Sequence, residues 1–337
     1  MRRTPLHRSI STLGLCATAL LVGACQKARP PLTLSSPTMS VTALNDHLLY
    51  FFDGRDSTPG ARYSKEWNWK DDAAMKLGVG TYVIHKGDQA LVFDTFTAPE
   101  QAQAVRGYLD QMGIKHVTVT LSHWHLDHVG GLAAWKDVEI VSTTRTRDAL
   151  VSQKDSIEAG TLWGPPAITP LIIPTKTFDD HYEFTVGDIK VDARNINIHS
   201  KDTEVLYLPA DRILLSGDAL EDELTYMVEI DGLPDHVRNL RAMREWDVAT
   251  FYPNHGDPQK IRSGGYDKTF IDATVAYITT MLAHSHDKNF LSLPMEDFVG
   301  ESVAKGWVHQ FEPYRDVHAQ NLKLVQDYWK GRPLPKL

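Results

Sequence analysis

Cysteine is almost absent from this 337-residue chain: only Cys16 and Cys25 occur, both close to the N-terminus. Two cysteines so placed cannot build a disulfide framework or a cysteine-rich zinc module. Basic residues are also in deficit, because Lys and Arg number 35 against 43 Asp and Glu, giving a net charge of −8. A chain without a basic excess has little to neutralise a phosphate backbone, so we expect no nucleic acid partner. With 42% hydrophobic and 23% charged residues, the composition is globular rather than disordered or coiled-coil.

The N-terminus has the composition of a targeting segment. Arg2, Arg3 and Arg8 form a positive start, and residues 10–24 are mostly small or apolar, too short a run to span a bilayer. This pattern predicts a signal peptide over residues 1–24 and an exported protein. Residues 25–41 contain many Pro, Ser and Thr residues and are predicted to form a flexible tether.

The end of this segment, Val22-Gly23-Ala24-Cys25, resembles the lipoprotein box of bacteria. The resemblance implies cleavage before Cys25 and attachment of lipid to it. Because Gln26 is not Asp, the resemblance to Gram-negative lipoproteins implies a periplasmic protein sorted to the outer membrane. Membrane contact is then expected only through the lipid anchor on Cys25. Ordinary secretory cleavage after Ala24, without lipid, is the alternative.

Runs typical of strands alternate with helical spacings along the rest of the chain. Residues 81–84 and 90–93 predict a hairpin, and apolar residues at helical spacing predict a helix over residues 99–112. The other expected strands are residues 117–121, 138–141, 184–193, 204–208, 213–215 and 250–252, and residues 232–246 are expected to be helical. After Gly265 only helices are expected, over residues 267–284, 294–305 and 314–330. The alternation indicates a layered α/β protein.

The chemistry is concentrated after the predicted strand 117–121, in the motif His123-Trp124-His125-Leu126-Asp127-His128. Alternate residues at a strand end point the same way, so His123 and His125 can hold one ion together. A turn beyond them lets Asp127 and His128 face a second ion. Imidazole and carboxylate ligands suit zinc, and they also suit iron or manganese. Burying four such groups without a metal would be costly, which disfavours a coincidental hydrophilic turn.

With this motif the chain resembles the metallo-β-lactamase superfamily over residues 42–262, leaving residues 263–337 as a C-terminal helical extension. Later segments match in order: His199 precedes the strand 204–208, Asp218 follows the strand 213–215, and His255 follows the strand 250–252. The resemblance implies an αββα sandwich with two metals at one sheet edge. It places His123, His125 and His199 at the first metal. It places Asp127, His128 and His255 at the second, with Asp218 bridging, one carboxylate oxygen to each ion.

The implied activity is that of a binuclear zinc hydrolase acting on a small-molecule ester, thioester, lactone or amide. A shared water would be activated by the two cations, and Asp127 would both ligate and orient it. Ser122 is expected to hydrogen-bond a metal ligand. A mononuclear iron sulfur (persulfide) dioxygenase shares the motif and is the alternative. A β-lactam-hydrolysing enzyme is a further alternative, with Asp218 atypical because true metallo-β-lactamases carry Cys or Ser there.

Substrate contacts are expected from aromatic segments near the site. Tyr226 could replace the tyrosine that lactonases often carry three residues beyond the bridging aspartate, where this chain has Glu221. Two aromatic inserts, residues 51–54 and 67–69, and the segment around Trp163 are expected near the pocket, although core packing is the alternative for them. His181 is the only rival to His199 as the third histidine of the first site, but it lacks the strand-end context.

Overall fold

The computed structural model describes residue 1 and residues 31–55 and 63–335, and it divides the chain into two compact units, residues 1–32 and 33–337. All the helices and strands discussed below belong to the second unit. Cys25 and the predicted signal peptide beyond Met1 lie outside the described residues, so their assignment stays a prediction. Within the described residues, none of the helices combines the length and the apolar character needed to cross a membrane.

The first sheet contains seven strands that are adjacent in the order of the sequence. They are β1 (Ser40–Ala43), β2 (Leu48–Asp53), β3 (Val79–Lys86), β4 (Gln89–Phe93), β5 (His116–Thr120), β6 (Glu139–Thr143) and β7 (Lys176–Phe178). The strands β1 to β4 pair antiparallel, whereas β4 to β7 pair in parallel. The carboxyl ends of β4, β5 and β6 therefore share one edge of the sheet.

The second sheet has five strands in the order β12-β11-β10-β9-β8. They are β8 (His181–Val186), β9 (Ile189–Asn195), β10 (Glu204–Leu208), β11 (Ile213–Gly217) and β12 (Thr250–Pro253). The prediction of one strand over residues 184–193 is wrong, because the chain reverses at Gly187 and β8 pairs antiparallel with β9. Gly187 has φ +62°, a conformation that glycine adopts without steric cost.

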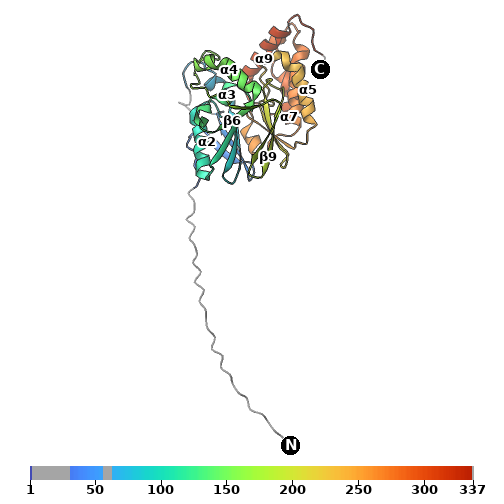
Figure 1. Ribbon diagram of the computed structural model, residues 1–337. Helices are drawn as coiled ribbons and strands as arrows, with labels where there is room; N and C mark the ends of the chain where they lie inside the picture. The colour runs from blue at the N-terminus through green and yellow to red at the C-terminus, as the bar shows by residue number, and fades with distance from the viewer. Residues whose placement is uncertain (2–30, 56–62, 336–337) are drawn as a thin grey trace. The chain divides into compact units, whose positions relative to one another are not determined.

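The two sheets pack face to face, and helices cover their outer faces (Figure 1). Along β2, Leu48, Tyr50 and Phe52 belong to the core cluster shared with the second sheet, whereas Leu49 and Phe51 belong to the cluster beneath the helices. This alternation is the period-two pattern of a strand buried on both faces. The phenylalanines of residues 51–54 are thus core residues, and the expectation that they line the pocket is wrong.

Helices α2 (Pro99–Met112) and α4 (Thr144–Glu158) lie on the outer face of the first sheet, and α5 (Leu233–Arg244) and α7 (Thr269–His284) lie on that of the second (Figure 1). The predicted αββα sandwich is therefore confirmed. The predicted bounds of α2 are those observed, with Gly113 at φ +83° ending the helix. The short elements are η1 (Lys70–Ala74), α1 (Met75–Leu77), α3 (Leu126–Val129), η2 (Leu132–Trp135), η3 (Ile230–Gly232), α6 (Pro258–Arg262) and η4 (Phe290–Ser292).

The predicted C-terminal helices are present as α7, α8 (Glu296–Ala304) and α9 (Tyr314–Trp329). Their apolar side chains, including Phe270, Tyr277 and Val325, are buried in the same core cluster as the second sheet. The extension thus packs on the sandwich as one body with it.

The start of the second unit lies earlier than the sequence suggested. Met39 is buried, the Thr33 backbone N–H donates to Gln111 Oε1 at 3.0 Å, and β1 begins at Ser40. Residues 33–41, expected as part of a flexible tether, therefore pack against the sandwich. Only the earlier part of the expected tether remains as a prediction.

Candidate metal centre

The candidate centre forms where strand ends from both sheets meet. Strand β5 leads into His123, β11 leads into Asp218, and β12 leads into His255. Because β11 and β12 run parallel, their following residues emerge at the same edge. Strand β10 is antiparallel to β11, so the residues before β10, including His199, return to that edge. The topology itself therefore gathers four segments that are far apart in the sequence.

Three imidazoles form a first group of donors. His123 Nε2 lies 2.8 Å from His125 Nδ1, and His199 Nε2 lies 3.1 Å from the same His125 atom. All three side chains are buried, and their donor atoms could hold one metal ion together. His199 has φ +68°, so its backbone is strained to present the ring at this point.

A second group joins one carboxylate and two imidazoles. His255 Nε2 lies 3.0 Å from Asp127 Oδ2, and His128 Nε2 lies 3.6 Å from the same oxygen. These donor atoms also lie close enough together to hold a metal ion. Asp127 is the most exposed of the three side chains and lines the cavity described below.

Asp218 lies between the two groups. Its Oδ2 atom lies 3.6 Å from His123 Nε2 and 3.9 Å from His199 Nε2 in the first group. The same oxygen lies 3.1 Å from His128 Nε2 and 3.5 Å from His255 Nε2 in the second group. One oxygen thus faces both groups, whereas the sequence suggested one oxygen for each ion. Oδ1 is buried and has no hydrogen-bond partner.

The remaining nitrogens of three rings contact polar groups that fix their orientation. Ser122 Oγ lies 2.9 Å from His123 Nδ1. His128 Nδ1 lies 2.9 Å from Asp94 Oδ2, and His255 Nδ1 donates to the Gly78 carbonyl at 2.6 Å. Partners of this kind set which ring nitrogen faces the metal. The sequence analysis singled out Ser122 but missed Asp94, whose signal was its position directly after β4 at the same sheet edge.

Glu221 is a further carboxyl group that the sequence analysis did not place at the centre. It is buried, its Oε1 lies 3.5 Å from His199 Nδ1, and it accepts a hydrogen bond from the Tyr226 backbone N–H at 2.9 Å. Burial, together with the negative charge of Asp218, raises the pKa of Glu221 to about 8. A neutral carboxyl at this point can therefore contact His199 without adding charge to the centre.

Burial and charge divide the histidines into two kinds. Burial lowers the pKa of His125 to about 3 and that of His199 to about 4, so both rings offer neutral lone pairs. Burial acts in the same direction on His255, but Asp218 and Asp127 outweigh it and raise its pKa to about 9. Burial opposes ionisation of Asp127, yet His128 and His255 lower its pKa to about 2.

These donor groups are able to hold metal ions. Imidazole nitrogens and carboxylate oxygens are donors that zinc accepts: the first group offers three imidazoles, and the second offers two imidazoles and one carboxylate. The buried Asp218 Oδ1 atom has no hydrogen-bond partner, which is costly in a site without a cation. The seven residues proposed from the sequence are thus brought together, and the group can hold metal ions.

A cavity of about 610 Å³ opens onto the centre. Its lining includes Trp67, Trp69, Trp163 and Tyr226, so the aromatic segment 67–69 and Trp163 lie where the sequence analysis expected them. The Trp163 ring lies 5.2 Å from the His125 ring and 6.4 Å from the Trp69 ring, measured between centroids. Helix α9 supplies another wall of this cavity, a role that the sequence did not reveal.

Two other features lie away from the centre. His181 is exposed at the start of β8, where it pairs with Asp192, and it belongs to none of the donor groups found among the described residues.

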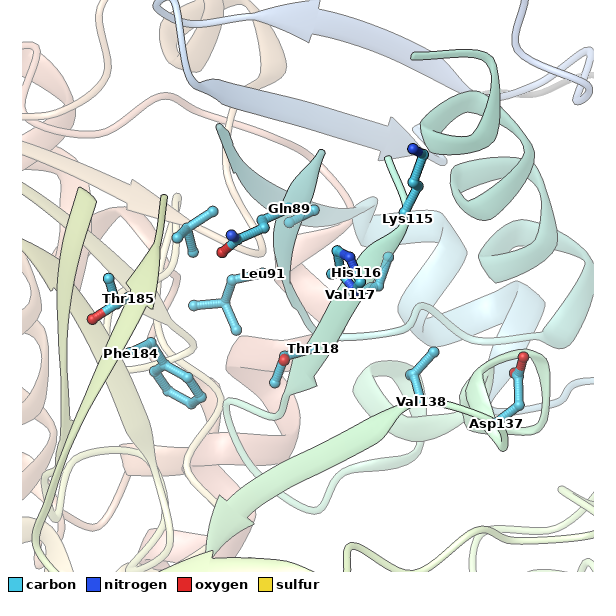
Figure 2. A pocket seen from close by; sticks show the side chains of 12 residues that line it. Gln89, Leu91, Lys115, His116, Val117, Thr118, Asp137, Val138, Phe184 and Thr185 are labelled. Atoms are coloured by element: carbon cyan, nitrogen blue, oxygen red, sulfur yellow. The ribbon is translucent and has the colours of Figure 1, made fainter. Parts of the chain in front are cut away.

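A second cavity, of about 280 Å³, lies at the opposite end of the strands, beside Gln89 at the start of β4 and His116 at the start of β5 (Figure 2). It has no connection with the metal donors.

The sequence of this chain is similar to those of known proteins. The family model described as "Metallo-beta-lactamase superfamily" matches residues 76–255. An atrochrysone carboxyl ACP thioesterase of Emericella nidulans is 28% identical over 181 residues, which are 53% of this chain and 52% of the relative. A linear primary-alkylsulfatase of a Pseudomonas species is 22% identical over 246 residues, covering 61% of this chain and 46% of the relative. The chain thus spans about half the length of these curated relatives.

Solved structures share the fold. A metallo-beta-lactamase from Pontibacter korlensis superposes with a TM-score of 0.54 at 16% identity, covering 72% of this chain and 99% of that one. VMB-1 gives the same TM-score and identity, covering 73% of this chain and 98% of its own. At this identity the likeness shows the fold alone.

Proposed function

Because the chain belongs to the metallo-beta-lactamase superfamily, we propose that it is a binuclear zinc-dependent hydrolase. The observation that carries the proposal is the position of Asp218 Oδ2, within 3.9 Å of imidazole nitrogens from both donor groups. His123, His125 and His199 would hold the first ion. Asp127, His128 and His255 would hold the second, and Asp218 would bridge them. Iron or manganese would suit the same donors.

The two ions, when bound, would act as Lewis acids that lower the pKa of a water and polarise the carbonyl oxygen of the substrate. The side chains and backbone of the protein would accept a proton and hold the metal ligands in position. Asp127 is ionised and lines the cavity, so with Oδ2 directed at His255 its Oδ1 atom can accept a proton from the attacking water. Ser122, Asp94 and the Gly78 carbonyl hold the rings of His123, His128 and His255 in place.

The substrate is proposed to be a small molecule with an ester, thioester, lactone or amide bond. Two observations support this class: the relatives named above include a protein called a thioesterase, and the centre opens onto a cavity large enough for a drug-sized molecule. A β-lactam would be a further substrate of the amide kind. The aspartate at position 218 differs from the Cys or Ser of true metallo-β-lactamases. We therefore propose β-lactams only after the esters, thioesters and lactones.

Metal analysis with a substrate panel tests the proposal. Purified protein is expected to contain about two zinc ions per chain and to hydrolyse at least one member of a set of lactones, thioesters, esters and β-lactams. An Asp127→Asn variant serves as the matched inactive control. Protein that carries one iron and consumes oxygen in the presence of a persulfide would instead establish the alternative, a mononuclear sulfur dioxygenase.

We also propose that the protein is exported and anchored to the outer membrane through lipid on Cys25. The support is the sequence Val22-Gly23-Ala24-Cys25 after a basic and apolar leader. The anchor would be the protein's only contact with the membrane, and the folded unit that starts at Thr33 would lie in the periplasm.

A further inference from the structure

The wall of the active-site cavity nearest the first donor group is aromatic. Trp163 packs edge-on against His125 and also contacts Trp69, whose indole N–H donates to the Pro166 carbonyl at 3.0 Å. That bond satisfies the only polar atom of the Trp69 side chain, so its rings present apolar surface to the cavity. Trp67 also lines the cavity and is 66% exposed, so its indole forms part of the mouth.

Another part of the cavity wall comes from the C-terminal extension. Pro313, Val317 and Ala319, at the start of α9 and along it, line the cavity, and none of them offers a polar side chain. Leu77 of α1 adds further apolar surface to the lining. A group held between the two walls would therefore exchange water for apolar contacts on both sides.

The charges around the mouth are unfavourable to an anion. Among the described residues that line the cavity, Lys76 is the one Lys or Arg side chain. Its Nζ lies 2.6 Å from Asp316 Oδ2 of α9, so its charge is already balanced. Asp72 also lines the cavity and adds a carboxyl group rather than a cation. A carboxylate on the distant part of a substrate would find no uncommitted cation there among these residues.

Building on the proposed hydrolase function, we infer that the group held between the tryptophans and α9 is uncharged and apolar, of about the size of an aromatic ring. The enzyme is then selective for acyl derivatives whose remote end is neutral, and it discriminates against those with a remote carboxylate. The specificity-determining residues are Trp163 on one wall and Val317 on the other, with the Lys76–Asp316 pair at the mouth.

A series of p-nitrophenyl esters that differ only in the acyl group tests the inference on the full zinc-loaded enzyme. The acetate measures basal hydrolysis, the 4-phenylbutyrate adds a neutral ring, and the glutarate monoester adds a remote carboxylate. We expect kcat/KM for the phenylbutyrate to exceed that for the acetate by at least about tenfold, since even one buried methylene gives about 10-fold or more. The glutarate monoester is expected to fall below the acetate.

Two variants locate the selectivity. Trp163→Ala is expected to reduce the ratio of kcat/KM between phenylbutyrate and acetate at least about fivefold, as expected for losing part of an apolar wall. Gln320→Lys places a cation on the exposed, cavity-facing side of α9 and is expected to raise the ratio of glutarate to acetate. Gln103→Lys adds the same charge on the exposed face of α2, away from the cavity, and is expected to leave both ratios unchanged.

The outcomes separate this inference from the proposed function. Hydrolysis of the acetate with equal or better kcat/KM for the glutarate monoester would overturn the inference and leave the hydrolase standing. A phenylbutyrate preference that survives Trp163→Ala would also overturn it, because the ring would then bind elsewhere. Absence of hydrolysis of every lactone, thioester, ester and β-lactam in the panel by zinc-loaded enzyme would overturn the proposed function itself.

Discussion

Glu221 Oε1 lies 3.5 Å from His199 Nδ1, on the side of the ring opposite the nitrogen that faces the other donors. The corresponding nitrogens of His123, His128 and His255 are hydrogen-bonded, whereas His199 Nδ1 makes no hydrogen bond and has this longer contact to Glu221 instead. Since the pKa of Glu221 is raised to about 8, its carboxyl is mostly neutral at neutral pH. We therefore expect Glu221 to act as a positioning residue that orients His199. A neutral polar side chain at position 221 should be sufficient for this role.

Glu221→Ala is expected to weaken zinc binding at the first site by about 10- to 100-fold, the cost usual for losing a group that orients a metal ligand. Glu221→Gln resembles the neutral carboxyl in shape and should retain most of the affinity. Competition with a zinc chelator measures both. Glu183→Ala, an equal truncation on the exposed strand β8, is the control. Equal affinity in Glu221→Ala and the control would show that His199 needs no partner.

Asp218→Cys should disturb the metal pair more than any change at His181. The single oxygen that faces both groups would be replaced by a softer sulfur of different reach, which favours zinc in one position. We expect fewer than two zinc ions per chain and a fall in turnover on the order of 10²-fold. His181→Ala, outside both donor groups, should keep its zinc. If His181→Ala loses zinc while His199→Ala keeps it, the site must be reassigned.

The sequence predicted those parts of the centre that arise from local pattern. His123, His125, Asp127 and His128 occupy one strand end, and the loops after the predicted strands 213–215 and 250–252 carry Asp218 and His255. A strand run followed by polar residues is a signal contained in a few consecutive positions. For the same reason α2 and the β3–β4 hairpin were predictable, since each is specified by its own apolar spacing and its own turn.

Features that depend on tertiary packing were not predictable. The Gly78 carbonyl that holds His255 has no side chain to give a signal, and Glu221 gains its role only because β11 and the loop before β10 meet at one edge. The wall formed by α9 arises from packing across most of the chain. The missed turn at Gly187 is different, because its Gly-Asp pair was a legible turn signal within an otherwise strand-like run.

Cys25 is expected to carry lipid at the N-terminus of the mature chain. The physical reason is that a basic start, an apolar run and small residues before Cys25 have the composition of a leader that would be cleaved at this point. Mass spectrometry of the N-terminal peptide should show the acyl mass, and the protein should fractionate with the outer membrane. Cys25→Ser should release it into the soluble periplasm, with Cys16→Ser as the matched control. An unmodified Cys25 thiol would exclude the anchor.

Glu223 should make the stability of the protein fall as the pH rises. Its side chain is buried, its Oε1 atom has no hydrogen-bond partner, and its Oε2 atom accepts from the Phe311 backbone N–H at 2.8 Å. Burial raises the pKa of Glu223 from 4.5 to about 7 in the folded protein. The folded state therefore binds more protons than the unfolded state between these values, and the stabilisation present at low pH is lost as the pH rises through 7.

Glu223→Gln removes this titration while it keeps an oxygen for the Phe311 N–H. The variant and the wild type should have similar melting temperatures at pH 5, where the wild-type carboxyl is protonated in the folded protein. At pH 8 the variant should melt at least about 2 °C higher, since about 1 kcal/mol corresponds to a shift of this size. Glu66→Gln, the same change at an exposed position, should show no pH-dependent difference. A Glu223→Gln difference that is equal at both pH values would mean that the Glu223 carboxyl is already ionised in the folded protein at pH 5.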